Sequence, residues 1–135
     1  MALPGKDQKL LRLIVFKKET EQNSKELKIW MSKIFMMPVL NIMDSFDKAF
    51  DTIPEKLKDD AWILGITNIK KQMDDFLKMQ KVEAMVAMGE KFDPLKHEAI
   101  EVIEGGESGK IAEEVQKGYL MESEVLRPAR VKIYK

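Results

Sequence analysis

The run GGESGK (105–110) holds residue types that could bind a phosphate, because glycines and a lysine are the components of a phosphate-binding loop. Such a loop needs a glycine, four further residues and then Gly-Lys-Ser/Thr. Here Glu104 stands at the first glycine position and Ile111 follows the lysine. We therefore predict a turn between two strands at this place.

His97 and Glu98, in the run HEAIE, resemble half of a zinc-protease motif. The position of the second histidine holds Glu101, and His97 is the only histidine of the chain. A catalytic zinc needs three protein ligands. The sequence therefore predicts no metal here, and we expect His97 to hydrogen-bond to a turn near Pro94.

Adjacent carboxylates could do acid–base work, and they occur three times: Asp59–Asp60, Asp74–Asp75 and Glu113–Glu114. Neighbours on a helix do not share a face, and neighbours on a strand point to opposite sides. We interpret these pairs as solvated charge, and the ten methionines as core filling. No catalytic constellation remains, so we expect a binding or scaffolding protein without a cofactor, not an enzyme.

Composition excludes several further classes. Among 135 residues, 23 Lys and Arg balance 23 Asp and Glu, and a nucleic-acid binder would show a basic excess. The chain has no cysteine, which excludes disulfides and thiolate sites. The apolar runs 10–16 and 34–43 are shorter than the ~20 residues of a membrane span. We therefore expect a soluble, cytoplasmic protein.

Residues 6 to about 53 are predicted to be helical. The stretch Lys17–Glu26 has no apolar side chain, so it cannot pack into a core. Pro38 removes a backbone donor and predicts a kink or a break. Apolar residues return at helical spacing after the polar stretch; those that we assign to a dimer interface are Leu27, Ile34, Phe46 and Phe50.

A second helix is predicted from a cap at Asp59 or Asp60 to about Gln80. Its apolar positions form a heptad seam, which we also assign to the dimer interface: Trp62, Ile66, Ile69, Met73 and Phe76. Further apolar side chains lie off this seam: Phe35, Met36, Leu64 and Leu77. Dimerisation of the two-helix hairpin into a four-helix bundle would bury them.

Residues 82–135 are predicted to form a small all-β domain, because glycines and short β-type runs become frequent there. The runs are 99–103, 111–115, 125–126 and 131–134. The sequence thus predicts an α+β protein with a helical dimerisation region (1–81) and a β-domain (82–135). About fifty residues give a thin core, so this domain is expected to lean on the helices or on a partner.

The motifs of the chain, in their order, resemble the GrpE family, the nucleotide exchange factors of DnaK-type chaperones. In the β-part these are FDPLKHEA (92–99), VQKGY (115–119) and VLRPARV (125–131). In the helical part they are FKKETE (16–21), DSFDKAFD (44–51) and WILGITNI (62–69). The resemblance covers residues 16–135.

This resemblance implies a parallel homodimer whose β-domains hold the ATPase domain of the chaperone open, so that ADP leaves. It implies no covalent chemistry and no nucleotide bound by the factor itself. The partner-binding residues that it implies are Lys17, Lys18, Lys48, Asp51, Gly65, Val115 and Glu124. For Arg127 and Pro128 it does not separate a role in folding from one in contact.

Several positions depart from the family pattern. Glu124 stands where a basic residue is usual, which would repel an acidic partner site unless the chaperone compensates or Arg130 or Lys132 takes over. Lys81 replaces a glycine, and Pro38 lies three residues before the usual proline. The acidic N-terminal tail common in the family is not among these 135 residues, and the start of the chain fits either a truncated or a naturally short form. Glu124 leaves one alternative open, a coiled-coil dimeric adaptor without exchange activity.

Overall fold

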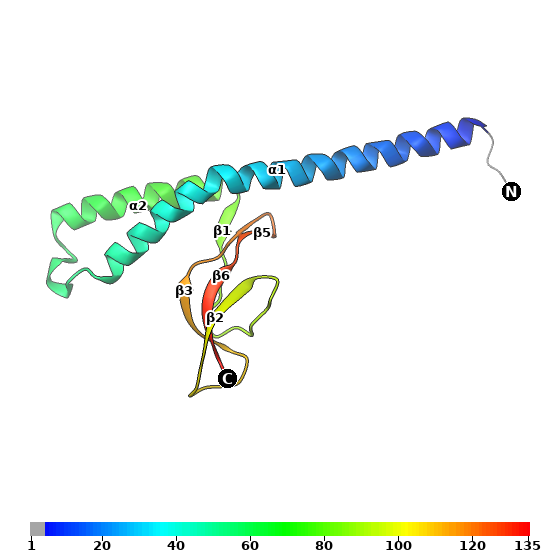
Figure 1. Cartoon of the computed structure of the whole chain (residues 1–135). Helices are drawn as coiled ribbons and strands as arrows, with labels where there is room; N and C mark the ends of the chain where they lie inside the picture. The colour runs from blue at the N-terminus through cyan, green and yellow to red at the C-terminus, as the bar shows by residue number, and fades with distance from the viewer. Residues whose placement is uncertain (1–4) are drawn as a thin grey trace.

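The computed structural model describes residues 5–135, so the first four residues of the predicted helical region lie outside it. The long helix α1 spans Gly5–Asp51, the short 3-10 helix η1 spans Glu55–Leu57, and helix α2 spans Ala61–Met79. Figure 1 shows α2 running back along the C-terminal part of α1, while the N-terminal half of α1 extends away from the rest of the chain. Both predicted helices are confirmed.

Helix α1 is unbroken over 47 residues, which corresponds to a length of ~70 Å. Pro38 lies inside it and does not end it. Figure 1 shows the helix changing direction in its cyan part, the part of the chain that includes Pro38. Of the two predicted outcomes, the structure therefore shows the kink and not the break. All residues of the polar stretch 17–26 are exposed, as their composition requires.

The cap of α2 is Asp60, whose carboxylate accepts a hydrogen bond from the backbone N–H of Trp62 at 2.9 Å. Beyond its C-terminus, Lys81 has a φ of 60°. That is the left-handed region, where glycine avoids the clash of a Cβ atom. This backbone conformation explains why a glycine suits the position at which the sequence departs from the pattern.

Six strands follow: β1 (Val82–Ala84), β2 (His97–Ile103), β3 (Ile111–Gln116), β4 (Tyr119–Met121), β5 (Glu124–Arg127) and β6 (Ala129–Tyr134). They form two three-stranded sheets, in the orders β1-β4-β5 and β2-β6-β3. Strand β6 pairs parallel with β2 and antiparallel with β3. The four predicted runs lie in β2, β3, β5 and β6. The run GGESGK forms the turn between β2 and β3, as predicted.

One hydrophobic core joins the helices to the first sheet, and its buried members are Met36, Leu40, Met43, Leu77, Val82, Tyr119, Met121 and Leu126. A second, smaller core lies within the β-part and contains Met85, Ala87, Ile111, Ala129 and Val131. The β-part therefore packs against the helices, which is one of the two outcomes expected for a domain of so few residues.

The expectation that dimerisation buries Met36 and Leu77 is wrong, because the first sheet already covers both side chains within one chain. The sequence shows that these residues lie off the heptad seam, but it does not show which element covers them. Phe35 and Leu64 remain exposed.

Candidate functional site

Five of the nine predicted dimer-interface residues are exposed to solvent in the single chain. Leu27, Ile34, Trp62, Ile69 and Phe76 have exposed fractions between 41% and 71%. The other four are half-buried: Phe46, Phe50, Ile66 and Met73. Large apolar side chains on two neighbouring helices are therefore available to a partner.

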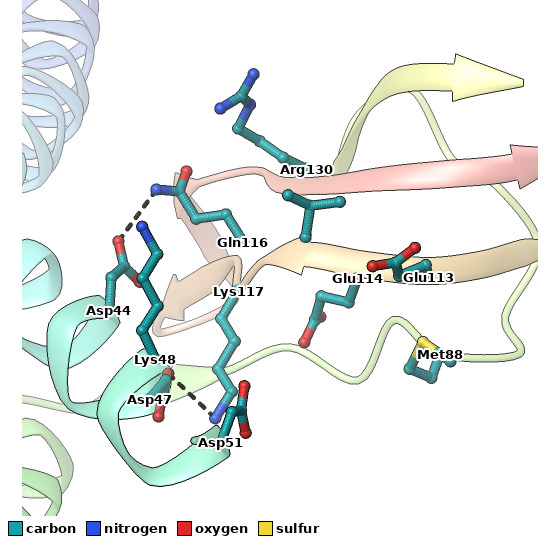
Figure 2. Close-up of a pocket in the computed structure, with 11 residues that line it drawn as sticks. Asp44, Asp47, Lys48, Asp51, Met88, Glu113, Glu114, Gln116, Lys117 and Arg130 are labelled. Carbon is teal, nitrogen blue, oxygen red and sulfur yellow. Dashed lines mark hydrogen bonds and ion pairs between the residues drawn. The ribbon is translucent and has the colours of Figure 1, made fainter.

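A groove of about 430 Å³ lies between the C-terminal part of α1 and strand β3 (Figure 2). It brings together three of the predicted partner-binding residues, Lys48, Asp51 and Val115, which are up to 67 positions apart in the sequence. The remaining lining residues are Asp44, Asp47, Met88, Glu113, Glu114, Gln116, Lys117 and Arg130.

A buried ion pair fixes one wall of the groove against the other. The guanidinium of Arg127 donates from Nη1 and Nη2 to the two carboxylate oxygens of Asp44, both at 2.8 Å. It also donates from Nε and Nη2 to the carbonyl oxygen of Lys117, and it lies 5.2 Å from the ring centre of Tyr119. Gln116 Nε2 donates to Asp44 Oδ2 at 3.0 Å. Arg127 therefore holds β5 on α1, which assigns it a role in the fold.

Asp47 is the next acidic side chain along α1, and it contacts two lysines. Lys117 Nζ lies 3.5 Å from its Oδ2, and Lys70 Nζ of α2 lies 3.7 Å from its Oδ1. Figure 2 shows Lys117 reaching from the β-part to this carboxylate. Asp47 thus links all three parts of the site, namely α1, α2 and the β-part.

Glu114 differs from the other acids of the groove, because its Oε2 is covered and has no hydrogen-bond partner among the described residues. Burial raises the pKa of this carboxyl; nearby Lys117 lowers it and Asp47 raises it. The interpretation of the pair Glu113–Glu114 as solvated charge is therefore wrong for Glu114. The pairing of β3 with β6 shifts register between Glu114 and Gln116. At such a bulge neighbouring side chains no longer alternate strictly, so Glu114 and Val115 both line the groove.

The other predicted partner-binding residues lie outside the groove. Lys17 and Lys18 are exposed on the projecting half of α1. Gly65 is exposed on α2, and a Cβ atom at this position would meet nothing within 4 Å in the chain. No close approach within the described chain explains this glycine, so any such approach must involve another molecule.

Glu124 lies beside α1, with its Oε1 3.8 Å from Lys25 Nζ. Glu122, in the turn that precedes β5, lies 3.7 Å from Lys28 and 3.2 Å from Lys81. The side-chain hydrogen bond from Lys81, together with the charge of Lys28, lowers the pKa of Glu122. The acidic turn between β4 and β5 thus faces lysines of its own chain, which the sequence did not reveal.

Arg130 and Lys132 are the two basic residues that could replace a cation at position 124. Lys132 Nζ lies 3.3 Å from Glu101 and 3.4 Å from Glu113, and Arg130 lies 3.9 Å from Glu98. Lys132 is therefore engaged by carboxylates on both neighbouring strands. Arg130 keeps a side chain that is 47% exposed and lines the groove, so it is the more available of the two.

His97 is structural, as predicted. Its ring is buried, and Nδ1 accepts a hydrogen bond from the backbone N–H of Asp93 at 2.9 Å. Burial lowers the pKa of His97. Within residues 5–135, no cluster of three or more acidic or histidine side chains is arranged to hold a metal ion. None of the described helices is long and apolar enough to cross a membrane.

Comparison with known proteins identifies the family. A family model described as GrpE matches residues 8–135. The chain belongs to the GrpE family. Among its relatives, Protein GrpE of Bacillus velezensis is 29% identical over 137 residues, covering 97% of this chain and 72% of that protein. Protein GrpE of Gloeobacter violaceus is 34% identical over 134 residues, covering 94% and 68%.

Protein GrpE of Carboxydothermus hydrogenoformans is 34% identical over 125 residues, which is 89% of this chain but 62% of that relative. The chain thus spans less than two thirds of that protein. The GrpE family is that of the nucleotide exchange factors of DnaK chaperones, so the family expected from the motifs is confirmed. An adaptor without exchange activity is not favoured.

Sequence reasoning on this GrpE-family chain missed Asp44, Gln116 and Glu114. Asp44 is one of several charged residues in the sequence of the long helix, and the motif VLRPARV does not show which residue pairs with its arginine. The separation of Asp44 and Arg127 by 83 positions hides their contact from any local pattern. The one available signal was the placement of Arg127 between apolar Leu126 and Pro128.

Proposed function

We propose that this chain promotes ADP release from a DnaK-type chaperone by binding the ATPase domain in its open state. A binding protein shifts such an equilibrium only by its difference in affinity for the two states. The groove between α1 and β3 supports this proposal, since it brings Lys48, Asp51 and Val115 onto one surface. The contact is made by a β-domain of residues 82–135, with Lys17, Lys18, Gly65 and Glu124 as further contact residues.

The proposal includes a homodimer in which α1 and α2 of two chains form a four-helix bundle. The exposed apolar side chains on both helices support it, because a stable chain in water normally covers such a surface. The protein does no covalent chemistry, binds no nucleotide, nucleic acid, cofactor or membrane itself, and works in the cytoplasm.

Stopped-flow release of a labelled ADP from a DnaK-type chaperone tests the exchange activity. We expect faster release with the chain than without it. Unchanged release, with binding retained in calorimetry, would favour the adaptor instead.

A pair of valine variants tests the contact surface. Val115→Asp places a charge in the groove, where the side chain is 44% exposed, and is expected to reduce the acceleration of release. Val102→Asp is the matched control, since Val102 is 56% exposed on β2, outside the groove. Equal loss in both variants would contradict a contact centred on the groove.

Sedimentation equilibrium tests the dimer. Ile69 lies in the heptad seam and is 46% exposed, so Ile69→Asp should leave the chain folded and shift its mass toward that of one chain. A wild-type protein of single-chain mass at micromolar concentration would refute the dimer.

A further inference from the structure

Glu114 and Asp51 are the acidic side chains of the groove that form no ion pair among residues 5–135, and Glu114 is the one with a covered oxygen that has no hydrogen-bond partner there. Asp44 is bound by Arg127, Asp47 contacts Lys70 and Lys117, and Glu113 lies 3.4 Å from Lys132. No ion pair to Glu114 is present among residues 5–135. Its carboxylate has lost part of its water without gaining a donor, which destabilises the charged form.

The surroundings of Glu114 suit a long cationic side chain. The groove is about 430 Å³ in volume and open, and Met88 and Val115 line it with exposed fractions of 56% and 44%. Lysine and arginine place an aliphatic stem on apolar surface and a charged head on an acceptor. Asp51, on the α1 side, adds a second negative charge of the same site.

We propose that Glu114 binds a lysine or arginine side chain of the chaperone that docks in this groove. The inference rests on the proposed function and names the partner chemistry of the same surface. A buried polar group without a partner calls for a physical explanation, and an incoming cation supplies the missing hydrogen bond once the carboxylate turns its covered Oε2 toward the groove. The folded free chain is then less stable than it would be with a neutral side chain, and binding relieves this cost.

This proposal predicts opposite effects on stability and binding. Glu114→Gln keeps the shape of the side chain and removes its charge. The pKa of Glu114 is raised in the folded state, so folding favours the neutral form of the carboxyl. The stabilisation from this neutral form is present in acid and is lost as the pH rises through the folded-state pKa. The variant should therefore melt at a higher temperature than wild type at pH 7, and the difference should vanish in acid.

The affinity of Glu114→Gln for the chaperone should fall, whereas its thermal stability should rise. Losing a hydrogen bond to a charged group is expected to weaken binding roughly tenfold. Calorimetric titration of the full chain into the nucleotide-free ATPase domain measures this affinity. Glu104→Gln is the matched control, since Glu104 lies in the exposed turn after β2, with a side chain 83% exposed.

The possible results distinguish failure of this inference from failure of the proposed function on which it rests. Higher stability with weaker binding for Glu114→Gln, and no change for Glu104→Gln, supports the inference. Wild-type affinity of Glu114→Gln overturns it, as does a loss of stability, which would show that the carboxylate has a structural partner. If wild type itself neither binds the chaperone nor accelerates ADP release, the proposed function fails, and that result is visible without any variant.

Discussion

The ion pair between Asp44 and Arg127 should be the strongest single link between α1 and the β-part. Both oxygens of Asp44 accept from Arg127 at 2.8 Å, and the two side chains are only 16% and 7% exposed. Arg127→Met keeps the aliphatic packing and removes the guanidinium. Asp44 then retains the bond from Gln116 alone.

The expected cost follows from the burial of the pair. Removing one partner of a buried ion pair destabilises a protein by about 3–5 kcal/mol, because the other charge stays buried. The remaining bond from Gln116 and the partial exposure of Asp44 place this case at the lower end, about 3 kcal/mol. For a chain of this length, each kcal/mol lowers Tm by about 4 °C, so a fall of about 12 °C is expected.

Urea unfolding followed by circular dichroism measures this cost, with the protomer concentration held constant because a dimer would make stability depend on it. Asp44→Asn and the double variant complete a cycle, in which a coupling above about 1.5 kcal/mol is expected. Lys28→Met breaks the exposed pair with Glu122 and is the control, with an expected change below about 1 kcal/mol. A coupling near zero would refute the reasoning that the pair joins the two parts.

Four smaller predictions concern single positions. Gly118→Ala should cost about 1–3 kcal/mol in urea unfolding, because a Cβ atom there would lie 2.5 Å from the backbone nitrogen of Ala129. Gly65→Ala should stabilise α2 by up to about 1 kcal/mol and should weaken chaperone binding in calorimetry if a partner approaches closely there. Burial raises the pKa of Tyr119 to about 12. The stabilisation that comes from keeping the Tyr119 phenol neutral is therefore present below pH 10 and is lost as the pH rises through about 12. Tyr119→Phe should abolish this loss of stability in alkaline melting curves. Glu124→Arg should change stability by less than about 1 kcal/mol, since it breaks only an exposed pair, so a change in ADP release would report a contact with the chaperone.

Local patterns predicted the elements well where they are long. The extent of α1, a kink or break at Pro38 and a cap at Asp59 or Asp60 all follow from residues within a few positions of one another. The structure shows the kink (Figure 1) and the cap at Asp60. Strands β1 and β4 were missed because three residues are too few to show a period of two. Their existence depends on pairing with each other across up to 39 positions, as between Val82 and Met121.

The candidate site was predicted in part. The resemblance to the family indicated Lys48, Asp51 and Val115, and the structure places all three in one groove. It did not indicate the unpaired carboxylate of Glu114, because burial of a single side chain depends on the bulge in β3 and on the helix opposite.

The sequence by itself determined the fold class, the family and the absence of cysteine chemistry, since these follow from composition, periodicity and motif order. Only the tertiary structure decided which faces are covered. It buries Met36 and Leu77 under the chain's own sheet, and it joins Asp44 to Arg127 across 83 positions. The physical reason is that helix and strand periodicity is set by neighbours along the chain, whereas burial and ion pairing are set by whichever distant segment the chain brings into contact.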